Sequence, residues 1–331
     1  MELRAWCAAL CAGMMGVVGC GGSSGENQGS GSSGASGTGS SSGTGSSSGT
    51  GSSSGTGSSS GGSGEGGGLL DPGSSGALGG TGGQGAGSAG CEHVDVVFAL
   101  DNSSSMNEEK ESMRDVVFPA FAQALLNIES IKDFRAAVLD ACPSPANFHT
   151  RGNAGECSFQ SGEVWMDSSS TALTSEFQCV ADLYSDDMEC SGNSDDEQPA
   201  SAVAAALEAP FSEEANAGFL RDDALLVVVA ITDEDEQPVP RQSPQEIHDR
   251  LVATKGEAKN VVFLGIGGQT ECDGVYGSAD EAQNMQRLVS TFAEDGRGFF
   301  WDLCAGRLED GLTNALSTIE AACEEFVPPP R

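Results

Sequence analysis

The hydrophobic and polar residues of this chain form two patterns that alternate after residue 90. Short continuous apolar runs are typical of strands buried in a parallel sheet. Such runs occupy residues 94–100, 134–139, 224–231, 260–266 and 298–303, and a shorter candidate covers 163–166. We expect each of these segments to be a strand.

Between these runs, apolar residues recur at intervals of three and four, the spacing of one helix face. This spacing predicts helices at 113–128, 200–207, 282–292 and 308–326. Pro119 lies inside the first helix and should kink it or shift its start, because proline removes a backbone donor. A further helix should begin at Pro244, where Ser243 and Glu246 have the spacing of a capping box.

The alternation of strands and helices predicts the fold class. It indicates one α/β domain with a doubly wound, mostly parallel sheet flanked by helices. We assign this domain to residues 91–331, because 241 residues are enough to build a complete hydrophobic core.

Residues 1–19 have the pattern of a signal peptide. Arg4 gives a short basic start, and the apolar stretch 5–18 is too short to span a bilayer as a helix. Its end, Val17-Val18-Gly19-Cys20, resembles a bacterial lipobox, in which cleavage leaves a lipid-modified cysteine as the first mature residue. The resemblance implies that lipid on Cys20 anchors the protein in the cell envelope without a spanning helix. Gly21 resembles the default signal for the outer membrane.

Residues 20–90 begin with this cysteine and continue almost wholly as Gly, Ser and Thr, with Gly-Thr-Gly-Ser-Ser-Ser repeated between 37 and 60. Such a segment has few apolar side chains to offset its backbone entropy, so we expect it to be disordered. Its length gives a typical span of roughly 45 Å. The segment would serve as a tether that holds the domain away from the lipid.

Cysteine usage also indicates an exported domain. Two cysteines leave with the signal peptide, Cys20 carries lipid, and an even number remains, as expected for disulfides. The remaining cysteines are Cys91, Cys142, Cys157, Cys179, Cys190, Cys272, Cys304 and Cys323. We predict loop staples at Cys142–Cys157, Cys179–Cys190 and Cys272–Cys304, and a link between the domain ends at Cys91–Cys323. Zinc binding is the alternative, but histidines are scarce.

Two of the apolar runs end in a carboxylate. The run at 94–100 is followed by Asp101-x-Ser103-x-Ser105, and the run at 224–231 is followed closely by Asp233. Open α/β sheets bind ligands at the carboxyl ends of their strands, and carboxylate and hydroxyl oxygens suit a hard divalent cation. These residues therefore predict a site for Mg²⁺ or Mn²⁺, with Ca²⁺ as a further candidate.

Asp-x-Ser-x-Ser after a buried strand, together with a second strand that ends in Asp, resembles the von Willebrand factor A (vWA) domain. The resemblance covers nearly all of the chain after Cys91. It implies a metal-ion-dependent adhesion site (MIDAS), whose cation binds a carboxylate of a partner protein.

The third element of that family site does not match. The family uses a Thr from a loop before a helix, whereas the loop 191–199 contains none. Glu197 or Ser194 is the candidate replacement. Thr171 and Thr174 are alternatives if the alignment shifts, although both fit an ordinary helix start. A Glu197 ligand would add negative charge and weaken the demand of the cation for a partner's carboxylate.

The residues from Cys91 onward are strongly acidic, with 45 Asp and Glu against 14 Lys and Arg, which leaves 31 net negative charges. Such a surface repels nucleic acid and anionic lipid. We expect the acidic runs 186–187, 195–197 and 234–236 to be solvated loops, although Glu234 stands where the vWA family has glycine. No Gly-x-Ser-x-Gly, His-Glu-x-x-His or phosphate-loop motif occurs, so we do not expect an enzyme.

Together these features predict a lipid-anchored, disulfide-stapled vWA-like domain on a flexible stalk. Its expected function is to bind a protein or other acidic ligand through a divalent cation. Two alternatives remain open. One is an envelope interaction module that keeps the vWA fold but has a degenerate metal site. The other is a metal-dependent hydrolase that uses the cation as a Lewis acid.

Overall fold

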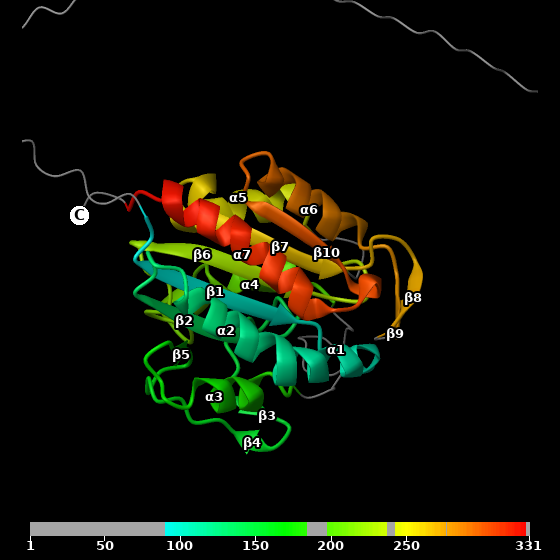
Figure 1. Ribbon diagram of the computed structural model, residues 1–331, viewed down its shortest axis with the longest axis horizontal. Helices are drawn as coiled ribbons and strands as arrows, with labels where there is room; N and C mark the ends of the chain where they lie inside the picture. Colours follow the sequence, from blue (N-terminus) through cyan, green and yellow to red (C-terminus); the bar gives the residue numbers. More distant parts are fainter. Residues whose placement is uncertain (1–89, 184–196, 237–241, 276, 329–331) are drawn as a thin grey trace, which may run out of the picture. The chain divides into compact units, whose positions relative to one another are not determined.

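The computed structural model describes residues 90–183, 197–236, 242–275 and 277–328. The predicted signal peptide and almost all of the linker therefore lie outside the described residues. In the described part, the chain forms a six-stranded sheet covered by helices (Figure 1). Among these residues, no helix combines the length and apolar composition needed to cross a bilayer.

Five strands of the sheet follow the predicted apolar runs closely, whereas the predicted strand 163–166 shares only Met166 with the observed β5. Its strands are β1 (His93–Leu100), β2 (Asp133–Leu139), β5 (Met166–Asp167), β6 (Ala224–Ile231), β7 (Val261–Gly267) and β10 (Gly298–Asp302). Their spatial order is β10-β7-β6-β1-β2-β5, and only β5, at one edge, pairs antiparallel with its neighbour. The predicted α/β class with a mostly parallel sheet is confirmed.

The strand order reverses direction at β1. From β1 the chain first winds outward through β2 to β5, and it then returns to place β6 on the other side of β1. Open α/β sheets bind ligands at such a reversal, beyond the carboxyl ends of the two strands. The sheet topology therefore places the candidate ligand-binding edge between β1 and β6.

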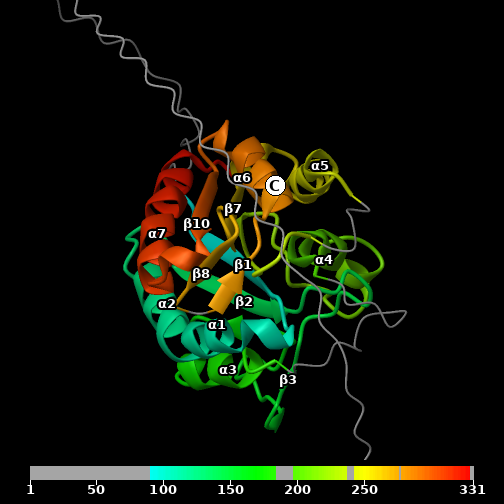
Figure 2. The ribbon, with the colours of Figure 1, turned by 90° about the vertical axis from the view of Figure 1, so that its right-hand side faces the viewer.

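Helices cover both faces of the sheet (Figure 2). They are α1 (Asn107–Ser112), α2 (Phe118–Leu126), α3 (Leu173–Val180), α4 (Pro199–Ala206), α5 (Pro244–Lys255), α6 (Gln283–Ala293) and α7 (Leu308–Glu325). The side chains of β1 alternate between the faces: Val96 and Phe98 join the core under α2 and α7, whereas Val97 and Ala99 join the core under α4, α5 and α6. Two hydrophobic cores thus fix the central strand from both sides.

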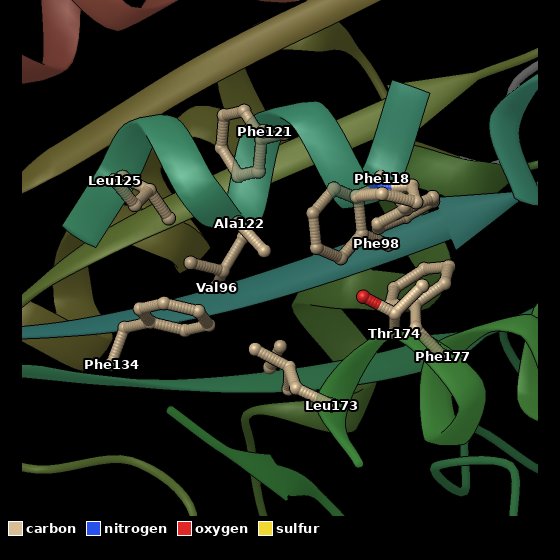
Figure 3. Close-up of a pocket in the computed structure, with 12 residues that line it drawn as sticks. Val96, Phe98, Phe118, Phe121, Ala122, Leu125, Phe134, Leu173, Thr174 and Phe177 are labelled. Atoms are coloured by element: carbon tan, nitrogen blue, oxygen red, sulfur yellow. The ribbon is translucent and has the colours of Figure 1, made fainter. Parts of the chain in front are cut away.

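The first predicted helix contains an irregular turn. A π-helical turn at Met113–Val117 separates α1 from α2, and Pro119 lies in the first turn of α2. This position suits proline because a helix leaves its first backbone donors without intrahelical partners. Phe118 then packs against Phe98 of β1, with ring centroids 4.1 Å apart, and Phe177 of α3 contacts the same ring (Figure 3). The prediction was a kink or a shifted start at Pro119, and the structure has a separate helix, α2, that begins at Phe118.

Helix α5 begins as predicted. The Ser243 hydroxyl accepts a hydrogen bond from the Glu246 backbone amide, and Glu246 Oε2 accepts from the Ser243 amide at 2.7 Å. Gly256 ends the helix in a left-handed conformation, which glycine adopts without a Cβ clash. Two short hairpins, β3 (Arg151–Gly152) with β4 (Gly155–Glu156) and β8 (Cys272–Gly274) with β9 (Gly277–Ala279), were not predicted.

Two predicted disulfides are confirmed and two predicted pairings are wrong. Cys91 pairs with Cys323, and Cys272 pairs with Cys304. Cys157 pairs with Cys179 instead of Cys142. The reason is the fold of the β3–β4 hairpin, which lies against the end of α3, where Cys179 is located. Cys142 is also in a disulfide, and Cys190 lies outside the described residues.

Candidate metal centre

The ends of β1 and β6 bring the two predicted acidic residues to the same edge of the sheet. The strands are parallel neighbours, with Leu100 opposite Ile231. The Asp101 amide donates a hydrogen bond to the Ile231 carbonyl at 3.0 Å, so the pairing extends beyond the strands themselves. Asp101 and Asp233, separated widely along the chain, therefore begin adjacent loops at the winding reversal.

Asp101 is buried and held by its own chain. Its side chain is 1% exposed, its Oδ1 accepts from the Ser103 amide at 2.8 Å, and its Oδ2 accepts from the Thr232 hydroxyl at 2.8 Å. Burial raises the pKa of Asp101, against the opposing effect of these hydrogen bonds. The Thr232 contact was not predicted. The position of Thr232 immediately before Asp233, on the strand beside β1, is the signal that could have identified it.

The two serines of the motif present their hydroxyls toward solvent. Ser103 is partly exposed and Ser105 is exposed, and their Oγ atoms are 2.9 Å apart. The Ser105 hydroxyl also hydrogen-bonds to Asp233, which links the two loops. Behind them, the Lys110 ammonium donates to the Asn102 and Ser103 carbonyls, each at 3.1 Å. The loop is thus fixed from within while its hydroxyls remain accessible.

Asp233 has an incomplete set of hydrogen bonds. The residue is 3% exposed, and its Oδ1 is a buried oxygen that accepts no hydrogen bond from the described residues. Burial raises the pKa of Asp233 to about 6, and the negative charge of Asp101 adds to this effect against the Ser105 hydrogen bond. A buried acceptor without a donor is costly. A cation is one group that would satisfy it.

A further carboxylate at this edge was not predicted. Glu109, in α1, is 1% exposed, and its Oε2 accepts no hydrogen bond from the described residues. Burial raises the pKa of Glu109 to about 7, and the charges of Asp233 and Asp101 contribute to the shift. The sequence did contain a signal: Met106, Glu109 and Met113 have helical spacing, so this glutamate lies on the buried face.

The candidates for the third family position have different outcomes. Glu197, just before α4, is buried, so the prediction that it lies in a solvated loop is wrong. Ser194 lies outside the described residues. Thr171 hydrogen-bonds with Gln160. Thr174 lies in α3 near the phenylalanine cluster of Figure 3. The described contacts join neither threonine to Asp101 or Asp233.

The prediction that residues 234–236 form a solvated acidic loop is wrong for two of its members. Asp235 accepts hydrogen bonds from the Asn284 amide and side chain at 2.9 and 2.8 Å. Glu236 is buried and accepts from the Ala200 amide at 2.7 Å and the Ser201 hydroxyl at 2.8 Å. Glu236 therefore caps the start of α4, and burial raises its pKa to about 7.

In the described part of the chain, two cysteines and one aspartate come together at the end of β10. The potential ligand atoms of Cys272, Asp302 and Cys304 lie within 4.8 Å of one another. The two sulfurs are joined in a disulfide, however, and thiolates are the form of cysteine that binds metal. Asp302 Oδ1 accepts from the Gln269 and Cys304 amides, each at 3.2 Å. The cluster therefore stabilises a loop in its present form.

The sequence matches no protein-family model and no curated protein. Among solved structures, the chain is similar to proximal thread matrix protein 1 from the mussel byssus, with 12% sequence identity and a TM-score of 0.40. The match covers 70% of this chain and 49% of that one, so the chain spans about half the length of that protein. This similarity is too low to assign a fold or a function.

Proposed function

We propose that this protein is an extracytoplasmic binding module of vWA type that holds its ligand through a divalent cation. The observation that carries the proposal is the meeting of Asp101 and Asp233 at the winding reversal, where Asp233 has a buried unpartnered oxygen. The hydroxyls of Ser103 and Ser105 lie at the solvent-facing side of the same loops. These oxygens fit Mg²⁺ or Mn²⁺, and Ca²⁺ also favours such donors.

In this arrangement the protein residues perform two tasks. Asp101 and Asp233 provide negative charge in a buried setting, where electrostatic attraction to a cation is stronger than in water. The serine hydroxyls provide neutral oxygens at the surface, so an incoming ligand reaches the same cation from solvent. The cation would supply the bond to the oxygen of the ligand. This division of roles supports binding and requires no proton transfer.

The proposal includes a location and a mode of display. The lipobox-like sequence at Cys20 and the Gly/Ser-rich linker would anchor the domain in the cell envelope, and the disulfides of the domain are compatible with an oxidising compartment. A lipid on Cys20 would provide attachment to the outer membrane. The partner would be a protein or another ligand that offers an oxygen to the cation.

A second candidate is a vWA-type module with a degenerate metal site. One observation favours it: both Asp101 oxygens already accept hydrogen bonds from Ser103 and Thr232, and the two serine hydroxyls lie within hydrogen-bonding distance of each other. A site satisfied in this way would capture its partner by direct contacts. Partner binding that persists in a chelator would support this candidate.

The proposal predicts that Asp101→Ala abolishes binding of Mg²⁺ and Mn²⁺, because the variant removes a buried anionic ligand from the site. The measurement is isothermal titration calorimetry on the full-length protein after treatment with a chelator. Asp302→Asn is the matched control, since Asp302 also ends a parallel strand but belongs to the disulfide loop, and it should retain the affinity. Absence of metal binding by the native protein would contradict the proposal.

A further inference from the structure

Glu109 is a charged residue on the buried side of a surface helix. Helix α1 starts directly after the loop that carries Asp101, Ser103 and Ser105. Its neighbour Glu108 is exposed, as expected for a helix rich in charge, whereas Glu109 is 1% exposed. An ionisable group is rarely buried to this extent without a partner. The burial of Glu109 therefore needs an explanation that the hydrophobic core does not provide.

The hydrogen bonds of Glu109 do not account for its burial. Its Oε2 accepts none from the described residues, and the charged neighbours that most affect its pKa are the acidic residues Asp233, Glu108 and Asp101. Burying a carboxylate among other carboxylates costs free energy in the absence of a cation. We therefore expect Glu109 to destabilise the metal-free domain.

The unpartnered oxygens of Glu109 and Asp233 belong to different elements of the same edge. Asp233 Oδ1 comes from the end of β6, and Glu109 Oε2 comes from the first turn of α1. With Asp101 they form a group of three buried carboxylates from three segments of the chain. Their oxygens do not all lie within 4.8 Å of one another, so ligation by all three would require at least one of these side chains to move. One divalent cation would satisfy both unpartnered oxygens.

We propose that Glu109 supplies a third carboxylate to the cation site of Asp101 and Asp233, and that the ligand therefore completes the site with a neutral oxygen. This inference rests on the proposed function. Three carboxylates exceed the charge of one divalent cation, so a fourth carboxylate from a partner would be repelled. The neutral donor would be a hydroxyl or a carbonyl oxygen. This ligand class differs from the acidic partner predicted from the Asp-x-Ser-x-Ser motif.

The test compares Glu109→Gln with Glu108→Gln in the full-length protein. Mn²⁺ is titrated by calorimetry, and the thermal midpoint is measured in a chelator. Glu109→Gln should weaken Mn²⁺ binding by about tenfold or more and should raise the thermal midpoint of the metal-free protein, since it removes a buried unpartnered charge. Glu108→Gln should change both quantities far less, because Glu108 is exposed and its charge is screened by water. We expect a metal ligand to produce both changes together, with the loss of Mn²⁺ affinity as the larger effect.

The ligand class is tested with sodium acetate as a minimal carboxylate, by the broadening of its methyl NMR signal near protein-bound Mn²⁺. Glu109→Gln should broaden the signal more per bound Mn²⁺ than the wild type does, because the variant site has one negative charge fewer. Unchanged Mn²⁺ affinity in Glu109→Gln would overturn the inference and leave the proposed function intact. Equal broadening of the acetate signal in both proteins would overturn the inference that the ligand completes the site with a neutral oxygen. Absence of Mn²⁺ binding by the wild type would overturn the proposed function itself.

Discussion

At the scale of single residues, the buried carboxylates near the two ends of β1 differ in their hydrogen-bond donors. Asp95, near the start of the strand, is fully buried and bound by Arg221, whose amide and Nε donate to it at 2.7 and 2.8 Å. Asp101, at the other end, accepts only uncharged donors in the described hydrogen bonds. The guanidinium of Arg221 thus neutralises Asp95, whereas no guanidinium pairs with Asp101 in the described hydrogen bonds.

Arg221→Met tests the paired end. The variant leaves the buried Asp95 carboxylate without its guanidinium, so the free energy of unfolding should fall by about 3 kcal/mol. Denaturant unfolding at neutral pH measures the change. Adding Asp95→Asn to Arg221→Met should recover most of the loss, because the double variant no longer buries an unpaired charge. A single variant as stable as the wild type would show that the pair contributes little.

The residues of the site were predictable where strand ends bear a carboxylate. Asp101 and Asp233 follow long apolar runs, and the parallel pairing of those runs brings them together. Glu109 was missed because charged residues at a helix start usually face solvent, and its burial depends on how α1 packs over the strand ends. Glu236 was missed for a similar reason, since capping of α4 by a residue 36 positions away is a tertiary contact.

At the scale of elements, hydrophobic periodicity predicted the long, regular helices and strands. The capping box of α5 and the buried run of β6 were found at their true positions because local side chains determine them. The short hairpins were not assigned, since two- and three-residue strands have no measurable alternation. Helix α1 lies outside the predicted range 113–128, and α3 was indicated only by a helix start near Thr171 and Thr174. The wrong cysteine pairing follows from this gap: without the β3–β4 hairpin, nothing in the sequence places Cys157 beside Cys179.

The Cys157–Cys179 disulfide provides a test of this region. Non-reducing peptide mapping should recover the two cysteines in one linked peptide. Replacement of both by serine should lower the free energy of unfolding by about 2 to 4 kcal/mol, because the unfolded chain gains freedom. Metal affinity should stay the same, since the disulfide joins the β3–β4 region to α3. A linked peptide that contains Cys157 and Cys142 would contradict the structure.

At the scale of the whole molecule, buried acids dominate the pH dependence of stability. Burial raises the pKa of Glu236 and Glu109 to about 7 and that of Asp233 to about 6. Their neutral forms are therefore favoured in the folded state, whereas the unfolded chain ionises near pH 4 to 4.5. Carboxyls with lowered pKa, such as Asp133, act in the opposite sense, but only at lower pH.

The metal-free protein should accordingly be more stable near pH 5 than near pH 8. Between these values the unfolded state binds fewer protons than the folded state, so stability falls as the pH rises. Glu236→Gln should flatten this dependence and gain up to about 3 kcal/mol at pH 8. Thermal unfolding in a chelator across this pH range is the measurement. Stability that rises between pH 5 and pH 8 would contradict the prediction.

Strand β1 also has a mechanical role. The Cys91–Cys323 disulfide lies just before the start of β1 and Asp101 lies just after its end, and the eight-residue strand between them is about 26 Å long. A pull on a ligand held at Asp101 would therefore reach Cys91 along the length of β1. The backbone hydrogen bonds to β2 and β6 would then be loaded in shear and would have to break together. Under tension, we expect the ligand to detach before the sheet yields.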